Sequence, residues 1–151
     1  GNRELLQDDG EIRKALKGAM AEEFSACLDQ PLGKLKPEGT DLSGGQWQRL
    51  AVARALFGGK PYIVLDEPAA AIDPVAESQM YETFRQSLKG RTGIVVSHRL
   101  ASAAFSDRIF VIHEGKAAES GTHRELLEKN GIYAHMWKVQ SRWYREGGEE
   151  V

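Results

Sequence analysis

Three short apolar runs, rich in β-branched residues, constrain the fold of this chain most strongly. They cover residues 62–65, 93–97 and 108–112, and each has the length and composition of a strand buried on both faces of a sheet. A helix is expected between the first two runs, starting at Pro74 and ending at Gly90, and a short helix between the second and third. Strands that alternate with helices predict right-handed βαβ units, and therefore an α/β fold built on a parallel sheet.

Helical patterns flank this strand-rich region. Apolar residues recur at helical spacing over residues 8–29, and an almost wholly apolar stretch predicts a buried helix over residues 46–57. A capping box at Thr122–Glu125 and an amphipathic pattern over residues 132–144 predict two further helices. The acidic, glycine-containing end at residues 146–151 is expected to be a flexible tail.

The composition excludes several classes of partner and environment. The chain has 151 residues and a formal net charge of -2, which gives no electrostatic case for nucleic acid as a partner. No apolar run approaches the roughly 18 residues that a membrane span needs. The single cysteine, Cys27, cannot form an internal disulfide, and we expect it to be a small buried apolar residue.

The start of the helix near residue 44 uses residues that helices disfavour. Ser43 and Gln46 form a capping box, yet Gly44 and Gly45 fill the first turn, where each costs up to about 1 kcal/mol relative to Ala. A helix N-terminus attracts anions, and a residue without a Cβ lets a phosphate approach its backbone closely. The pattern therefore favours a phosphate site, although a plain helix start after a loop remains an alternative.

Polar residues follow the first two predicted strands. Asp66 and Glu67 come directly after residues 62–65, and His98 comes directly after residues 93–97. Ligands of parallel sheets bind beyond the carboxyl ends of the strands, where one carboxylate can hold Mg²⁺ and the other can orient or deprotonate a water. If the two strands are neighbours, His98 lies close to the acidic pair and can donate to a terminal phosphate. The alternative for Asp66 and Glu67 is a solvated pair at a strand end, and the alternative for His98 is a structural histidine.

In combination, these motifs resemble the nucleotide-binding domain of ATP-binding cassette (ABC) transporters of the exporter type. The run Leu42-Ser-Gly-Gly-Gln46, followed by Gln48 and Arg49, resembles the family's signature motif. "YIVLDEP" at residues 62–68 resembles its Walker B strand, "AAID" at residues 70–73 its D-loop, and His98 its switch histidine. Residues 114–137 are similar to the end of exporter cassettes. The resemblance implies a partial P-loop NTPase fold, with a helical signature subdomain at residues 1–45. It is followed by a parallel-strand core with flanking helices at residues 46–145, which is the C-terminal part of the ATPase core.

The resemblance also implies a role for each motif. Asp66 would hold Mg²⁺ through water, Glu67 would be the general base and His98 would contact the γ-phosphate of ATP. Asp73 would lie at an interface between two nucleotide-binding domains in a head-to-tail dimer. The signature residues would contact ATP bound to the opposite subunit, and they are Leu42, Ser43, Gly44, Gly45 and Gln46.

Two departures from the family pattern stand out. Ala69 and Ala70 occupy positions where the family commonly has hydroxyl residues, which removes possible polar contacts across the dimer. No G-x-x-x-x-G-K-[ST] pattern occurs in the chain, so the resemblance implies the C-terminal half of the domain without its Walker A loop. We therefore expect negligible ATP hydrolysis by this chain alone, and an uncovered sheet edge that favours self-association.

The predicted function is that of an ABC exporter ATPase, with ATP and Mg²⁺ as ligands. Its expected partners are a second nucleotide-binding domain and a transmembrane domain, at the cytoplasmic face of the cell membrane, with no nucleic acid. One alternative is an ABC-type ATPase of a DNA-repair or translation protein. Another is a non-catalytic interaction fragment that uses the open sheet edge or the terminal helix.

Overall fold

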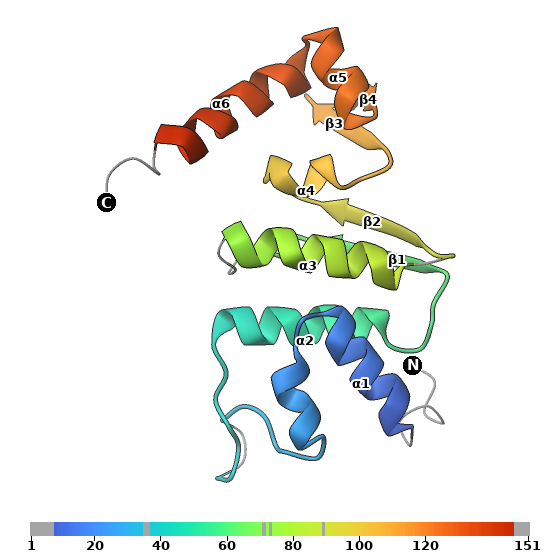
Figure 1. The fold of residues 1–151 in the computed structure, drawn as a ribbon, viewed down its shortest axis with the longest axis vertical. Coiled ribbons are helices and arrows are strands. Elements are labelled where there is room, and N and C mark those ends of the chain that lie inside the picture. Colours follow the sequence, from blue (N-terminus) through green and yellow to red (C-terminus); the bar gives the residue numbers. More distant parts are fainter. Residues whose placement is uncertain (1–7, 35–36, 71, 73, 89, 147–151) are drawn as a thin grey trace. The chain divides into compact units, whose positions relative to one another are not determined.

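The structure is a computed structural model that describes residues 8–34, 37–70, 72, 74–88 and 90–146 (Figure 1). It divides into two compact units, one ending at Val96 and the other beginning at Ser97, and each is described by itself. The predicted tail beyond Glu146 and the predicted interface residue Asp73 lie outside the described residues.

The first unit combines helices with a pair of parallel strands. Strand β1 (Tyr62–Asp66) pairs with β2 (Thr92–Val96) in parallel, in a register that joins Tyr62 to Thr92 and Asp66 to Val96. This pairing confirms the predicted parallel core and the connecting helix. The helices of the unit are α1 (Asp9–Gly18), the short 3₁₀ helix η2 (Glu22–Ala26), α2 (Gly44–Leu56) and α3 (Pro74–Ser87).

Only one face of this pair of strands is covered by the described residues. Ile63 and Leu65 are buried in a core with residues of α1, α2 and α3, such as Leu16, Val52 and Phe84. The alternate residues of β1 face the other way, and Tyr62 is 71% exposed. The prediction of strands buried on both faces is therefore wrong for the described residues, because side chains alternate along a strand and the helices pack on one side. The apolar residues left exposed on β1 and β2 are Tyr62, Val64, Ile94 and Val96.

The N-terminal helical pattern breaks earlier than the sequence predicts. Helix α1 begins after the N-cap Asp8, whose carboxylate accepts from the amide of Gly10 at 2.9 Å, and it ends at Gly18. Met20 has a φ of 53°, which stops the helix before η2. Cys27, expected to be buried, is exposed, because it lies in extended backbone just after η2.

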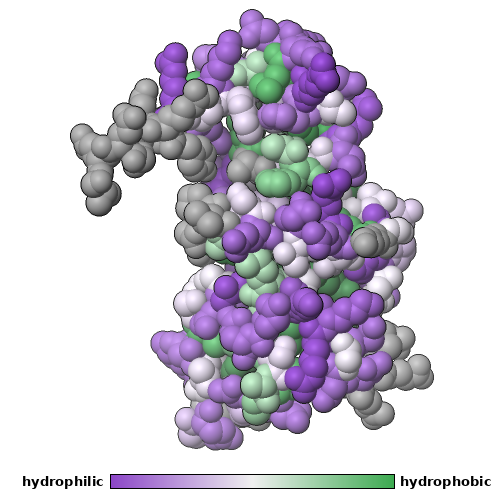
Figure 2. All heavy atoms as spheres, in the orientation of Figure 1, coloured by the Kyte–Doolittle hydropathy of each residue, from purple (hydrophilic) through white to green (hydrophobic). Residues whose placement is uncertain are grey.

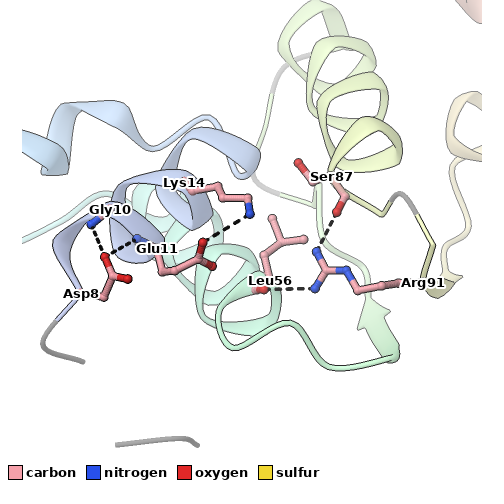
Figure 3. A network of polar contacts seen from close by, with 7 residues as sticks. All are labelled: Asp8, Gly10, Glu11, Lys14, Leu56, Ser87 and Arg91. Carbon is pink, nitrogen blue, oxygen red and sulfur yellow. Dashed lines mark hydrogen bonds and ion pairs between the residues drawn. The ribbon is translucent and has the colours of Figure 1, made fainter. Parts of the chain in front are cut away.

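Arg91 joins the ends of two helices in the first unit. Its guanidinium donates to the carbonyl of Leu56 at 3.2 Å, at the end of α2, and to the carbonyl of Ser87 at 2.7 Å, at the end of α3 (Figure 3). The last carbonyls of a helix lack partners within the helix and carry partial negative charge, so a cation that bridges two helix ends stabilises both.

Replacing Arg91 with Ala is expected to lower the free energy of unfolding by about 1.5–3 kcal/mol, the range for hydrogen bonds that involve a charged group. The measurement is urea unfolding followed by circular dichroism. Arg85→Ala is the matched control, since Arg85 lies exposed in the last turn of α3. Equal stability of the Arg91 and Arg85 variants would show that the bridge contributes nothing.

The second unit is built on an antiparallel hairpin. It contains α4 (Leu100–Ala104), β3 (Ile109–His113), β4 (Lys116–Gly121), α5 (His123–Lys129) and α6 (Ile132–Glu146). Strand β3 pairs antiparallel with β4, so the expectation that this third strand joins a parallel sheet is wrong for the described residues. The hairpin forms because Glu114 and Gly115 have φ values of 47° and 73°, as a tight two-residue turn requires.

A buried carboxylate fixes the start of α6. Glu119 on β4 is 8% exposed and accepts from the amides of Ile132 at 2.9 Å and Tyr133 at 3.0 Å. The hydrogen bond from Tyr133 holds the pKa of Glu119 below its ordinary value. A Cβ on Gly131 would lie 1.9 Å from the Glu119 carboxylate, so only glycine allows this approach. The side chain of Tyr133 is buried with Leu126 in the core of the unit.

Most of the surface on the face drawn in Figure 2 is hydrophilic, and hydrophobic residues emerge there in small separate patches. Among the described residues, no helix is long and apolar enough to cross a membrane.

Candidate functional site

The N-terminus of α2 has the geometry that the sequence predicts. The hydroxyl of Ser43 accepts from the amide of Gln46 at 3.2 Å, and the side chain of Gln46 accepts from the amide of Ser43 at 3.0 Å, which confirms the capping box. Gly44 and Gly45 lie within the helix, and neither has a positive φ. The backbone conformation therefore does not require glycine at either position.

This helix start has the features of an anion site. The first amides of a helix have no acceptor within the helix, so those of Gly44 and Gly45 are directed outward together with the positive end of the helix dipole. Ser43 and Gly44 are exposed, and the absence of a Cβ at two successive positions leaves the backbone open to close approach. A phosphate is the kind of ligand that such a terminus binds.

The end of β1 holds the predicted acidic pair in two different environments. The side chain of Asp66 is exposed, whereas that of Glu67 is half-buried. Glu67 has a φ of 45°, in the left-handed region that costs a residue with a side chain roughly 1–2 kcal/mol. Such strain persists only where neighbouring contacts enforce it, and it concentrates at functional sites.

Two contacts hold the backbone of Glu67 in this conformation. Its amide donates to the carbonyl of Val96 at 2.9 Å, at the end of β2. Its carbonyl accepts a hydrogen bond from the side chain of Gln48, which comes from the second turn of α2. The helix that begins with the two glycines is therefore attached directly to the strained residue at the end of β1.

The sequence motifs did not predict the contacts that Gln48 and Arg49 make with distant residues. Both follow the glycines in the sequence, but their partners lie far along the chain. Arg49 makes an ion pair with Glu23 of η2 at 2.5 Å, which fixes α2 against the N-terminal helices. The polar residues Gln48 and Arg49 near the start of a largely apolar helix were the available indication.

His98 lies two residues beyond the end of β2 and is the second residue of the second unit. Its side chain is exposed, and its main-chain carbonyl accepts from the side chain of Gln140 at 2.8 Å. The parallel pairing of β1 and β2 confirms that the strands preceding the acidic pair and His98 are neighbours.

Among the described residues, no group of three or more His, Cys, Asp or Glu side chains is arranged to hold a metal ion. The exposed carboxylate of Asp66 offers an oxygen ligand of the kind that Mg²⁺ prefers, and Mg²⁺ commonly keeps waters and takes its other ligands from a bound phosphate. The Asp66 carboxylate therefore fits a Mg²⁺ ion that is bound together with a nucleotide.

Comparison with known proteins finds a family model and several proteins that this chain resembles. The family model described as ABC transporter matches residues 3–70, a range that includes α2 and the end of β1. The ATP-dependent lipid A-core flippase of Alcanivorax borkumensis is 42% identical over 133 residues, which cover 87% of this chain. The flippase of the same name from Burkholderia thailandensis is 47% identical over 130 residues. Residues 3–70 of this chain therefore match the ABC transporter family, and most of the chain is similar to two proteins named as flippases.

A solved structure of the ABC transporter family shares the fold as well as the sequence. A bacterial Atm1-family ABC exporter with ATP bound matches 86% of this chain with a TM-score of 0.72 and 40% sequence identity. This similarity confirms an α/β fold that corresponds to part of an ABC nucleotide-binding domain. The chain spans 23% of the length of that exporter chain and 23% of the Alcanivorax flippase.

Proposed function

We propose that this chain supplies part of the ATPase of an ABC exporter, in which ATP binding and hydrolysis drive export across a membrane. The observation that carries the proposal is the strained Glu67 at the end of β1, fixed by Gln48 to the helix that begins with two glycines. The similarity to proteins named as flippases and exporters supports transport as the coupled process.

In this proposal, Glu67 is the general base. Its carboxylate takes a proton from a water that attacks the γ-phosphate, while the bond from that phosphorus to the ADP oxygen breaks, giving ADP and phosphate. A half-buried carboxylate on an enforced backbone is well suited to keep one orientation toward the water. His98 donates to the γ-phosphate and so stabilises the charge of the transition state.

The signature residues serve a nucleotide bound to a partner subunit. Ser43, Gly45 and Gln46 contact the γ-phosphate of that nucleotide, and Leu42 and Gly44 complete the signature that binds it. Two such domains then bind ATP between them in a head-to-tail dimer, with Asp73 at the interface. Residues 1–45 form the helical subdomain of this arrangement, and residues 46–145 belong to its core.

Asp66 would hold Mg²⁺ through water in this arrangement, and the ion would supply positive charge to the phosphates of the nucleotide. The exposed position of Asp66 at the carboxyl end of β1 suits a contact through water, since such edges of parallel sheets are where ligands bind.

The proposed setting is the cytoplasmic face of a membrane, where a transmembrane domain converts closure and opening of the dimer into substrate movement. The similarity to exporters favours this setting over a DNA-repair or translation ATPase. A purely non-catalytic interaction module is disfavoured by the enforced conformation of Glu67, since such backbone strain concentrates at functional sites.

Removing Mg²⁺ with EDTA is expected to abolish ATP hydrolysis by the complete transporter, and added Mg²⁺ is expected to restore it. Asp66→Asn keeps the size of the side chain but loses its charge, so it is expected to raise the Mg²⁺ concentration for half-maximal hydrolysis about tenfold or more. The measurement is phosphate release against Mg²⁺ concentration, with Asp41→Asn, an exposed residue two positions before Ser43, as the control. Hydrolysis that persists in EDTA would contradict the proposed ATPase.

A further inference from the structure

We propose that Gln140 of α6 is a positioning residue for His98, so that the C-terminal helix sets the conformation of the switch histidine. This inference rests on the proposed function of His98 but concerns a residue to which no motif gives a role. Gln140 lies 42 positions after His98, and both residues belong to the second unit.

The side-chain amide of Gln140 binds the main chain on both sides of Arg99. Its nitrogen donates to the carbonyl of His98 at 2.8 Å, and its oxygen accepts from the amide of Leu100 at 3.0 Å. Because a carbonyl can only accept and an amide N–H can only donate, these two partners fix the orientation of the Gln140 amide. One side chain thus satisfies a donor and an acceptor two residues apart.

The second contact replaces a missing helix cap. Helix α4 begins at Leu100, and its N-cap Arg99 provides no side-chain hydrogen bond to the helix. The amide of Leu100 is one of the first amides of α4 and has no acceptor within that helix. Gln140 therefore provides from another helix an acceptor for the first amide of α4, whereas an N-cap side chain ordinarily accepts from the second or third amide.

The hydrogen bonds of Gln140 join two segments that are each held by further contacts, the loop around Arg99 and helix α6. Within the loop, the hydroxyl of Ser97 accepts from the amide of Arg99 at 3.0 Å, and the hydroxyl of Ser102 donates to the carbonyl of Arg99 at 2.6 Å. At the other end, α6 is anchored by Glu119 at its first turn and by the buried Tyr133. A shift of α6 along its axis must therefore move the carbonyl of His98 or break its hydrogen bond.

The test uses the complete transporter with two substitutions of Gln140. Gln140→Met keeps the length of the side chain and loses both hydrogen bonds, whereas Gln140→Glu keeps the acceptor for Leu100 and loses the donor to His98. We expect kcat for ATP hydrolysis to fall about tenfold in the Met variant while KM for ATP stays within about twofold. This pattern is expected because loss of Gln140 would misplace His98, whose contact acts in the transition state. The Glu variant is expected to lose a similar factor, because a carboxylate faces the carbonyl of His98.

Gln86→Met on α3 is the matched control, since Gln86 is an exposed helical glutamine that donates to Glu82 at 3.0 Å. A second readout is the NMR resonance of the His98 ring, which is expected to broaden or shift in both Gln140 variants and to stay unchanged in the control. A merely structural role of α6 would lower the melting temperature without this selective change at His98.

His98→Ala separates failure of this inference from failure of the proposed function. A large loss of kcat in His98→Ala, together with normal kcat in Gln140→Met, would overturn the positioning role alone. Normal kcat in His98→Ala would overturn the role of His98 and the inference that rests on it. A selective loss of kcat in the Gln140 variants, with a changed His98 resonance, would support both.

Discussion

Replacing Glu67 with Gln is expected to lower ATP turnover by the complete transporter about 10²- to 10⁴-fold, the contribution that a positioned general base typically makes. Gln has nearly the same shape as Glu but cannot accept a proton at neutral pH, so the strained backbone of residue 67 and its contacts to Val96 and Gln48 remain. ATP binding is therefore expected to change little.

The measurement pairs steady-state phosphate release with equilibrium binding of a fluorescent ATP analogue. Glu38→Gln, at an exposed position, is the control for loss of one negative charge. Turnover within about twofold of the unmodified protein would remove Glu67 from the role of base, since that factor is far smaller than general-base catalysis provides.

Replacing Gly45 with Asp is expected to lower turnover about 10²- to 10³-fold, the loss that follows removal of a single preorganised hydrogen-bond donor to transition-state charge. The new carboxylate would lie in the first turn of α2, where it repels a phosphate and covers the amides. An acidic residue in the first turn of a helix is otherwise favourable, because it faces the positive end of the helix dipole. The variant is therefore expected to keep its fold, so that loss of turnover cannot be attributed to unfolding.

A pair of alanine substitutions provides the control for this prediction. Gly45 and Gly10 occupy the same second position of their helices, α2 and α1. Gly45→Ala is expected to lower turnover by closing the approach to the backbone, whereas Gly10→Ala is expected to leave it unchanged. Equal turnover in the two alanine variants would indicate that the glycines of α2 do not face a phosphate.

Local sequence patterns predicted the parts of the fold that depend on neighbouring residues. The capping boxes at Ser43 and Thr122 both form, because their partners lie three residues away. The parallel pairing of β1 and β2 also follows from the alternation of strands and helices. The family resemblance rested on these same local motifs.

The parts that the sequence did not predict depend on contacts between distant residues. Strand β4 has few apolar residues and was missed, although Gly115 in the preceding turn permits the hairpin that forms it. The exposed face of β1 depends on which elements cover it, and no local pattern contains that information. The hydrogen bond from Gln48 to Glu67 joins residues 19 positions apart, and the contact of Gln140 with His98 spans 42 positions.

We infer that the glycine-rich start of α2 and the carboxylate of Glu67 serve ATP bound between two different subunits. Mixing Gly45→Asp subunits with Glu67→Gln subunits of the complete transporter tests it directly, because each variant alone is expected to be nearly inactive. If the two motifs act on the same nucleotide from opposite subunits, a mixed dimer has one intact site and one site with both defects.

The measurement is ATP hydrolysis after the two variants are dissociated, mixed in equal amounts and reassembled. The rate of ATP hydrolysis is expected to recover to about a quarter of the unmodified rate. About half of the dimers are mixed, and each mixed dimer holds one intact site of two. Activity that stays at the level of the separate variants, in samples where mixed dimers are shown to form, would contradict the claim.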